Sequence, residues 1–228
     1  MIPNDEGLWV VVPAYNEAAV IATTLAELLA VAGNVVVVDD GSTDDTAERA
    51  RAAGARVLRH VLNLGQGAAL QTGIDYALER GARYVCTFDA DGQHDARTIE
   101  AMLALARTSG ADAVLGSRFL GTTEGMPRLR GWFLRAAIAF TRLQTGLPLT
   151  DTHNGLRLFA ASALARVRIE QPGMAHASEL LERIAKERLH VVELPTTVRY
   201  TDYSKAKGQK LSQSVRIMFD LLYAAWSR

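Results

Sequence analysis

Apolar positions in the first 120 residues fall into two alternating kinds of segment. Short continuous apolar runs predict strands, and longer segments with apolar residues three or four positions apart predict helices. A run such as Val-Val-Val-Val at 35–38 is typical of a parallel strand that is covered on both faces. The alternation predicts an α/β fold with a Rossmann-like, mostly parallel sheet, right-handed crossovers and flanking helices. The predicted strands lie in LWVVVPAYNE, VVVVDD, ARVLRH, ARYVCTFD and DAVLGSR.

Turn and capping residues set the expected boundaries of these elements. The first strand is expected to break at Pro13, and Asn16 is expected to cap the next helix, which Gly33 closes. Ser42 or Thr43 is expected to cap the second helix. The connections are too short for separate domains.

The pattern changes after Arg118. Residues 125–150 contain four arginines and no acidic residue. Apolar residues recur there at helical spacing, which predicts a basic amphipathic helix with an apolar face of Trp132, Ala136, Phe140 and Leu143. Such a helix lies on an anionic membrane surface, covers the sheet or forms a dimer interface, and the pattern alone leaves these alternatives open.

The C-terminal part continues with a predicted strand at LRLFA, a helix at HASELLERIAKER and a strand at VVELPTTVRY. A basic loop, DYSKAKGQK, leads to a final amphipathic helix. No low-complexity linker and no internal repeat interrupts the chain. We therefore expect one domain over 1–228, with a first part at 1–120 and an elaboration with amphipathic helices at 121–228.

Composition narrows the class of protein. Apolar residues make up 49% and charged residues 22%, as in globular proteins, and the 25 basic residues balance the 25 acidic ones. This balance gives no general attraction to nucleic acid. The single cysteine, Cys86, excludes an internal disulfide, and neither a signal peptide nor an apolar stretch of about 20 residues is visible. We expect a cytoplasmic protein, soluble or peripheral at the inner face of the plasma membrane.

Carboxylates follow two of the predicted strands, and ligands in open parallel sheets bind beyond such strand ends. Asp89, Asp91 and Gln93 would project oxygens from one turn, which suits Mg²⁺ or Mn²⁺. The alternative is a solvated, Asp-rich turn. Asp39 and Asp40, which follow the second strand, could accept hydrogen bonds from a nucleobase or ribose.

Two further segments are open to more than one interpretation. Pro13, Tyr15 and Glu17 could form a wall for a planar base, although a tyrosine in such a turn also serves packing. The glycine-rich NLGQGAALQTG could bind phosphate at a helix N-terminus, but it matches neither the P-loop nor the dinucleotide pattern. We expect Gly65 and Gly67 to provide backbone clearance.

Cationic and histidine side chains complete the candidates. An arginine at a strand end beside a carboxylate cluster suits an anionic substrate, or alternatively pairs with Asp89 or Asp91. The cationic candidates are Arg118, Arg130, Arg199, Lys205 and Lys207. The spacing of His153 and His176 gives no zinc pattern, and either Asp151 or Glu179 could serve as a base.

The ordered segments VVPAYNE, VVVVDDGSTD, NLGQGAALQTG, FDADGQHD and GSRF resemble glycosyltransferase family 2, in the branch of dolichyl- or polyprenyl-phosphate mannose and glucose synthases. The resemblance extends more weakly through THNGLRLF and YSKAKGQ. It implies a GT-A fold, a nucleotide-sugar donor that is GDP- or UDP-linked, Mg²⁺ or Mn²⁺ as cofactor, and inversion at the anomeric carbon. Residues 1–120 would bind the nucleotide-sugar and 121–228 would form the acceptor side.

The resemblance also assigns residues to roles. Asp89, Asp91 and Gln93 would face the metal, Arg118 and Arg130 the acceptor phosphate, and Lys205 the donor phosphates. The catalytic residues expected overall are Asp91, Arg118 and Asp151. The residues expected to bind nucleotide or substrate are Pro13, Ala14, Tyr15, Glu17, Asp39, Asp40, Asp89, Arg130, Arg199 and Lys205.

The expected function is transfer of a hexose from the nucleotide-sugar to a polyprenyl phosphate. A lipid phosphate is already an anion and needs no base, whereas a sugar hydroxyl acceptor would need one, for which Asp151 is the candidate. Two further classes of protein share this architecture, a non-catalytic nucleotide-binding protein and a nucleotidyltransferase. A nucleotidyltransferase would carry a glycine-rich basic loop where this chain has PAYNE.

Overall fold

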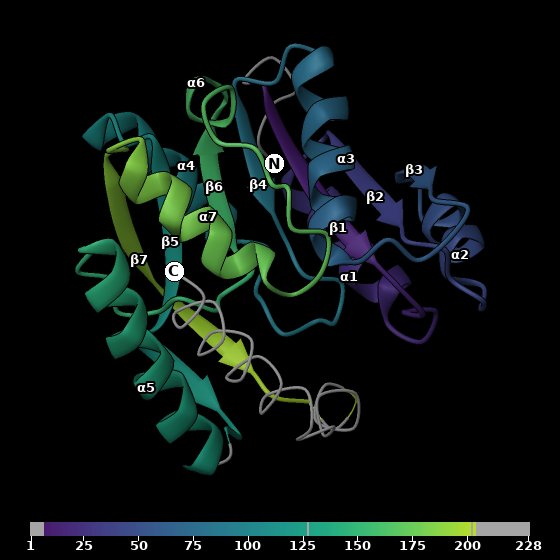
Figure 1. Cartoon of the computed structure of the whole chain (residues 1–228). Coiled ribbons are helices and arrows are strands. Elements are labelled where there is room, and N and C mark those ends of the chain that lie inside the picture. Colours follow the sequence, from purple (N-terminus) through teal and green to yellow (C-terminus); the bar gives the residue numbers. More distant parts are fainter. Residues whose placement is uncertain (1–6, 127, 202, 204–228) are drawn as a thin grey trace.

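A single seven-stranded sheet organises the chain in the computed structural model, which describes residues 7–126, 128–201 and 203 (Figure 1). The strand order is β3-β2-β1-β4-β6-β5-β7, and of these seven strands only β6 runs antiparallel to its neighbours. The mostly parallel α/β sheet expected from the sequence is therefore confirmed. The strands are β1 (Leu8–Ala14), β2 (Val35–Asp39), β3 (Arg56–Arg59), β4 (Tyr84–Thr87), β5 (Ala113–Glu124), β6 (Arg157–Ala160) and β7 (Val191–Arg199).

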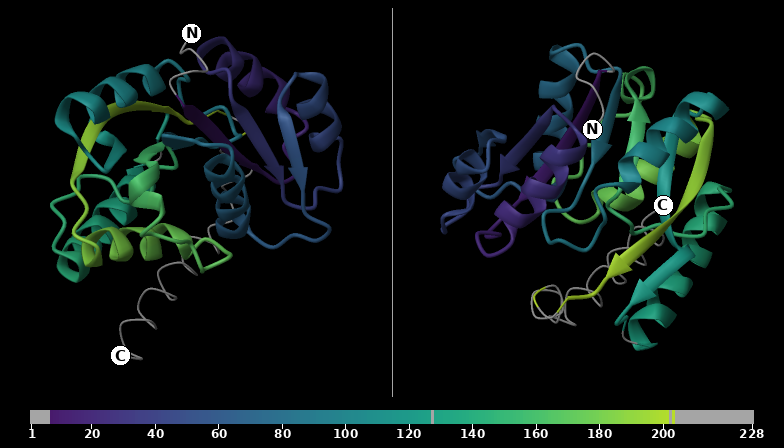
Figure 2. Two further views of the ribbon diagram at one scale, coloured as in Figure 1. Left: turned by 90° about the horizontal axis from the view of Figure 1, so that it is seen from above. Right: turned by 180° about the vertical axis from the view of Figure 1, so that it is seen from behind.

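Helices cover both faces of the sheet (Figure 2, left). One core joins the sheet to α1, α2 and α4, and the other joins it to α3, α6 and α7. Strands β1 and β2 are buried along their whole length, which explains their continuous apolar sequence. The helices are α1 (Ile21–Val31), α2 (Thr46–Ala52), α3 (Gln66–Glu79), α4 (Thr98–Ser109), α5 (Arg128–Thr145), α6 (Ala161–Leu164) and α7 (His176–Lys186).

Two expected boundaries are wrong at the end of β1. The strand continues through Pro13 to Ala14, because the pairing with β4 ends at Val11 and proline then leaves no gap in a ladder on that side. Asn16 does not cap α1, which begins at Ile21 without a side-chain cap. Asn16 instead has a φ of +53°, and its side chain accepts a hydrogen bond from the Thr43 amide.

The cap of the second helix also differs from the expectation. α2 begins at Thr46 after Asp45, with no side-chain cap. The Ser42 hydroxyl accepts a hydrogen bond from the amide of Asn16 instead, at 2.9 Å. The polar residues after β2 therefore connect the β1 and β2 loops, and do not start α2.

The antiparallel strand β6 is inserted between β4 and β5. Because it runs in the opposite direction, its N-terminal end lies beside the carboxyl end of β4. Arg157 pairs with Thr87, and the Thr87 hydroxyl donates to the Gly155 carbonyl at 2.7 Å. Residues 151–156 therefore reach the edge of the sheet where the parallel strands end.

The predicted apolar face of α5 does not pack on the sheet in the described part of the chain. Trp132 is 74% exposed and Leu143 is 85% exposed, whereas Gly131, Ile138 and Thr141 are the buried positions. α5 packs against α7, and the Arg135 guanidinium lies 5.4 Å from the ring centroid of Phe119 in β5. No helix among the described residues is both long and apolar enough to span a bilayer.

Candidate active site

The carboxyl ends of β1, β2 and β4, together with the middle of β5, open into one cavity of about 600 Å³. This is the edge at which ligands of open parallel sheets bind. Asp39, Asp151 and Arg199 are not among the residues that line the cavity. The predicted site residues that do line it are Pro13, Ala14, Tyr15, Glu17, Asp40, Asp89, Asp91, Gln93 and Arg118.

The acidic turn after β4 is held in place by its backbone. Gly92 has a φ of +71°, which reverses the chain at little steric cost, and the Asp91 carboxylate accepts the Gln93 amide at 3.1 Å. The Thr24 hydroxyl of α1 donates to the Ala90 carbonyl at 3.0 Å. The turn therefore presents Asp89, Asp91 and Gln93 to the cavity from a fixed backbone.

The two carboxylates of the turn differ in their affinity for protons. Burial raises the pKa of Asp91 to about 6, and the charge of Asp89 adds to this effect. Burial also opposes ionisation of Asp89, but the His94 imidazole and the Arg157 guanidinium lower the pKa of that carboxyl below its usual value. Asp89 is therefore the member of the pair that ionises more readily, and ionisation of Asp91 is unfavourable.

This donor set fits a hard divalent cation, because a cation between the carboxylates would replace repulsion by attraction. Mg²⁺ usually binds through one or two carboxylates together with substrate phosphates. Within the described ranges, no group of three or more His, Cys, Asp and Glu side chains is arranged to hold a metal. The site therefore fits a cation whose remaining ligands come from a substrate.

Gly155 makes room for the Asp89 carboxylate. A Cβ on Gly155 would lie 2.0 Å from Asp89 Oδ2 and 2.4 Å from its Cγ. Real Cβ atoms do not approach other atoms so closely, so any side chain here would displace the carboxylate. The segment before β6 thus sets the position of the acidic turn.

Arg118 is the most firmly held cation of the cavity. It is 6% exposed, and its Nε donates to Asp151 Oδ2 at 2.6 Å. Its Nη1 donates to the Tyr200 hydroxyl at 2.8 Å and its Nη2 to the His153 carbonyl at 2.6 Å. These bonds use three of the five guanidinium N–H groups, so two N–H groups are left for an anion in the cavity.

Asp151 and Glu179, the two candidate bases, are both engaged structurally. Asp151 is 2% exposed, and its carboxylate accepts the Arg118 side chain and the amides of Arg118 and His153. Glu179 accepts the amides of Glu170 and Gln171 and the Arg183 guanidinium. Asp151 therefore positions Arg118, and Glu179 fastens the loop before α7.

The two carboxylates after β2 face different surroundings. Asp40 lines the cavity, and it accepts hydrogen bonds from the amides of Leu64 and Gly65 and from the His60 ring. Asp39 is fully buried, accepts the Ser42 amide at 3.1 Å and lies 3.1 Å from Arg59 Nε. Asp40 thus shapes the loop beside the cavity.

The segment after β7 ties three parts of the site together. The Arg199 amide donates to the Gln93 carbonyl at 3.0 Å, while the Arg199 side chain is exposed and pairs with Glu124. Beyond Tyr200, the Tyr203 hydroxyl donates to Glu17 Oε2 at 2.7 Å. We refer to residues 199–201 and 203 as the strap.

Arg157 is a cation of the cavity that the sequence pattern did not single out. It is 5% exposed, and it donates to the carbonyls of Asn154 and Thr152. A lone arginine within the apolar strand LRLFA was the available signal. Arg157 and Arg118 provide two buried positive charges beside the acidic turn.

The glycine-rich segment at the start of α3 provides clearance, as expected. The amides of Gly67 and Ala68 donate to the Pro172 carbonyl at 2.7 and 3.2 Å, so they are not free for phosphate. A Cβ on Gly67 would lie 2.1 Å from the Gln171 carbonyl oxygen.

The side chains of three expected cations are not among the described parts of the structure. Lys205 and Lys207 fall outside the described residues. Arg130 is placed only as a backbone position in the first turn of α5.

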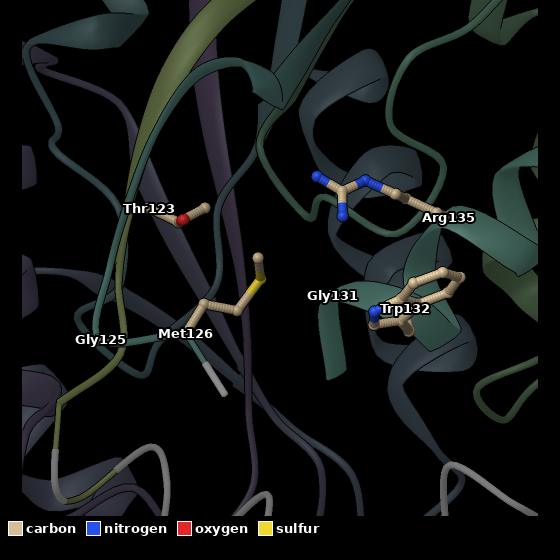
Figure 3. A pocket seen from close by; sticks show the side chains of 6 residues that line it. All are labelled: Thr123, Gly125, Met126, Gly131, Trp132 and Arg135. Carbon is tan, nitrogen blue, oxygen red and sulfur yellow. The ribbon is translucent and has the colours of Figure 1, made fainter. Parts of the chain in front are cut away.

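A smaller hollow of about 360 Å³ lies between the end of β5 and the start of α5. It is lined by Thr123, Gly125, Met126, Gly131, Trp132 and Arg135. Figure 3 shows Met126 and Arg135 extending toward it from opposite walls. This hollow combines apolar surface with the guanidinium of Arg135 from α5. Its other wall includes Thr123 of β5, the strand that also carries Arg118.

Comparison with known proteins identifies relatives over nearly the whole chain. An uncharacterised protein of Methanocaldococcus jannaschii is 36% identical, covering 96% of this chain and 92% of its own. A UDP-N-acetylglucosamine–dolichyl-phosphate N-acetylglucosaminyltransferase of Methanococcus voltae is 31% identical, covering 96% of each chain. An undecaprenyl-phosphate mannosyltransferase of Micrococcus luteus is 32% identical, covering 90% of this chain and 89% of its own.

The fold also matches solved structures. Glucosyl-3-phosphoglycerate synthase from Mycobacterium tuberculosis superimposes with a TM-score of 0.74 over 95% of this chain and 79% of that one, at 23% identity. This similarity supports a GT-A-like fold. The profile described as Glycosyl transferase family 2 matches residues 9–168, which hold nearly all of β1 to β6 and most of the residues that line the cavity. The chain therefore belongs to glycosyl transferase family 2.

Proposed function

We propose that this protein is an inverting glycosyltransferase that moves a hexose from a nucleotide-sugar to a polyprenyl phosphate. Two relatives that match nearly the whole chain are named as transferases acting on dolichyl or undecaprenyl phosphate. The observation that carries the proposal is a buried, positioned guanidinium, Arg118, in the same cavity as the acidic turn.

The donor nucleoside would lie against the ends of β1 and β2. Pro13, Ala14, Tyr15 and Glu17 line that side of the cavity, and the ring of Tyr15 is 41% exposed and suited to stack on a base. Asp40 lines the same side. A base and its ribose need such a combination of a flat surface and hydrogen-bond acceptors.

The donor diphosphate would lie over the acidic turn. Asp89, Asp91 and Gln93 would hold Mg²⁺ or Mn²⁺, which neutralises the charge that develops on a departing diphosphate. Solved neighbours of this fold have been crystallised with Mn²⁺ or Mg²⁺ and UDP, which is consistent with this assignment.

The acceptor side favours a phosphate over a sugar hydroxyl. Arg118 offers two remaining N–H groups, which match a phosphate oxygen pair, and Arg157 adds a second positive charge. A phosphate is already a nucleophile and needs no base. The Asp151 carboxylate, the candidate base for a hydroxyl, is fully engaged with Arg118.

A lipid acceptor would require access to a membrane surface, and α5 suits this task. Its exposed apolar face is combined with four arginines and no acidic residue in 125–150. Such a helix binds an anionic lipid surface through apolar contacts and charge attraction. We propose peripheral attachment through α5 at the cytoplasmic face.

The direct test is incubation of the purified chain with Mn²⁺, polyprenyl phosphate and a panel of labelled GDP- and UDP-hexoses. We expect a lipid-linked sugar with one of these donors. A product formed on a sugar hydroxyl but not on polyprenyl phosphate would show that the acceptor is a sugar hydroxyl and that the proposed acceptor is wrong. Nucleotide binding without any transfer would indicate a non-catalytic nucleotide-binding protein.

A further inference from the structure

His176 is a buried histidine of the cavity that takes no part in the proposed binding of the metal, the nucleoside or the acceptor. It is the first residue of α7, is 5% exposed and lines the same cavity as Asp89 and Arg157. Its Nδ1 lies 2.8 Å from the Gly173 carbonyl oxygen. A carbonyl oxygen only accepts hydrogen bonds, so Nδ1 carries the ring proton.

This tautomer leaves a lone pair on the other ring nitrogen. Burial and the charge of Arg157 lower the pKa of His176, so the ring is neutral near pH 7 and Nε2 is an acceptor. Among the described residues no hydrogen bond reaches Nε2. A ligand group at this nitrogen must therefore bring its own proton.

The ring is also held firmly. The Pro172 carbonyl is bound by the amides of Gly67 and Ala68, and Glu179 binds the amides of Glu170 and Gln171. A Cβ on Gly67 would lie 2.8 Å from the Cβ of His176, so the absence of a side chain there allows α3 to approach. The glycine-rich segment and Glu179 thus both hold the loop that leads to this histidine.

The chemistry of Nε2 selects among the parts of the donor. Phosphate oxygens carry no proton at neutral pH and are repelled by a lone pair, whereas a sugar hydroxyl can donate. Arg157, a pure donor, lines the same cavity, and its charge contributes to the lowered pKa of His176.

We propose that His176 is a specificity-determining residue that accepts a hydrogen bond at Nε2 from a hydroxyl of the transferred sugar. The inference rests on the proposed function, since it needs a nucleotide-sugar in this cavity. His176 would then select sugars by the position of a hydroxyl, independently of the nucleoside.

The test compares His176→Phe, which removes the acceptor, with His176→Gln, whose amide oxygen can take the place of Nε2. His190→Phe is the matched control, because His190 is exposed and outside the cavity. Binding of UDP, GDP, their hexose conjugates and the monodeoxy-hexose conjugates is measured with Mn²⁺ by calorimetry, and kcat/KM is measured where transfer occurs.

We expect the wild-type protein to discriminate against one deoxy-sugar by about tenfold to hundredfold, because a buried acceptor is left unpaired. His176→Phe should lose this discrimination and keep its affinity for the nucleoside diphosphate, and His176→Gln should restore much of it. The inference is overturned if His176→Phe discriminates as the wild type does, or if it loses nucleoside diphosphate binding while folded.

The two proposals fail in different ways. If nucleotide-sugars bind but no lipid-linked product forms, the proposed acceptor is wrong. The role of His176 is then tested by the binding measurements alone. If no nucleotide-sugar binds the wild-type protein, both proposals are wrong.

Discussion

At the scale of single residues, the site is built from charges that are buried and matched in pairs. Arg118 is paired with Asp151, and Asp89 is balanced by His94 and Arg157. Asp91 is the exception, because burial and its neighbour Asp89 both oppose its ionisation. A buried group that is unfavourable without its ligand is typical of a binding site.

Asp91→Asn should therefore stabilise the metal-free protein. The pKa of Asp91 is raised from 3.8 to about 6, so the folded state holds this proton more tightly and stability falls as pH rises through that interval. Removing the charge at pH 7.5 should recover of the order of 2 kcal/mol, or roughly 4–8 °C in Tm. The same variant should lose the additional thermal stabilisation that Mn²⁺ with UDP or GDP gives.

Asp95→Asn is the control, because Arg97 lowers the pKa of Asp95 and this carboxylate is favourable where it lies. It should leave Tm unchanged or slightly lower and keep the response to metal. If Asp91→Asn keeps the full Mn²⁺ response, Asp91 is not a metal ligand.

His153 should make the protein sensitive to acid. Burial, together with the charge of Arg157, lowers its pKa from 6.5 to about 4. The stability that depends on neutral His153 is present above pH 6.5 and is lost as the pH falls toward 4, since the unfolded chain takes up the proton first. Asp91 acts in the opposite sense over much of this interval, so the wild-type curve alone hides the effect.

The difference in Tm between the wild type and His153→Gln, measured as a function of pH, isolates the effect of His153. The wild-type Tm should fall relative to the variant between pH 6.5 and 4, by an amount that corresponds to about 2–3 kcal/mol. His190→Gln, at an exposed histidine, should run parallel to the wild type. Parallel curves for His153→Gln as well would show that His153 titrates normally.

At the scale of elements, the strap joins β7 to the rest of the site. Tyr200 is 4% exposed and accepts a charged hydrogen bond from Arg118, whereas Tyr203 is half-buried and donates to Glu17. Just before Tyr200, the Arg199 amide donates to the carbonyl of Gln93. The strap thus connects Arg118, the acidic turn and the wall proposed for the nucleoside.

The two tyrosines allow the same chemical change at a buried and at a more exposed position. Tyr200→Phe should cost about 2 kcal/mol, or roughly 4–8 °C in Tm, because it leaves a buried guanidinium N–H without this partner. Tyr203→Phe should cost about 1 kcal/mol or less. Thermal denaturation checks the ranking: a reversed order would mean that the strap is held mainly at Tyr203, and equal losses would mean that both tyrosines hold it equally.

The sequence predicted that Asp89 and Asp91 follow a strand of a parallel sheet, and parallel topology brings such strand ends to one edge. Arg118 lines the same cavity, but the expected end of its strand at this residue was wrong, because β5 continues to Glu124. The roles of Gly155, Arg157 and His176 could not be predicted, because each depends on a contact with a distant segment. Gly155 touches the carboxylate of Asp89, and the loop before His176 is bound by the start of α3.

Local rules also failed where distant partners replaced local ones. Asn16 and Ser42 have the composition of helix caps, yet they bind each other's loops across the ends of β1 and β2. The face of α5 is a related case. Its periodicity correctly predicted a helix, but periodicity alone does not say whether the apolar face packs on the sheet, lies on a membrane or forms a dimer interface.

At the scale of the whole molecule, the exposed apolar residues of α5 and its arginines lie on a helix at the edge of the fold (Figure 1). The hollow beside Arg135 adjoins this helix and the strand that carries Arg118. This arrangement would bring a lipid phosphate toward the cavity from the side of α5.

Sedimentation with vesicles tests the attachment. The protein should bind vesicles that contain phosphatidylglycerol more strongly than vesicles of phosphatidylcholine alone, and high salt should weaken this binding. Trp132→Ser together with Leu143→Ser should reduce binding by about tenfold or more, because both apolar contacts are lost.

Leu62→Ser is the matched control, since Leu62 is 69% exposed but lies in the loop between β3 and α3. It should bind vesicles as the wild type does. Equal loss of vesicle binding in both variants would indicate that binding depends on general surface hydrophobicity. Unchanged binding of the double variant would show that the apolar face of α5 does not attach the protein to the membrane.

The insertion of β6 between β4 and β5 has a consequence for synthesis on the ribosome. Although β1 to β5 are complete by Glu124, the neighbour that joins β4 to β5 is Arg157–Ala160. In a nascent chain β4 therefore lacks a partner on one side until β6 leaves the exit tunnel, and β5 lacks partners on both sides until β6 and β7 follow. Unpaired strand edges invite association with other chains. Slow translation after β5 should consequently lower the fraction of this protein that reaches its native state.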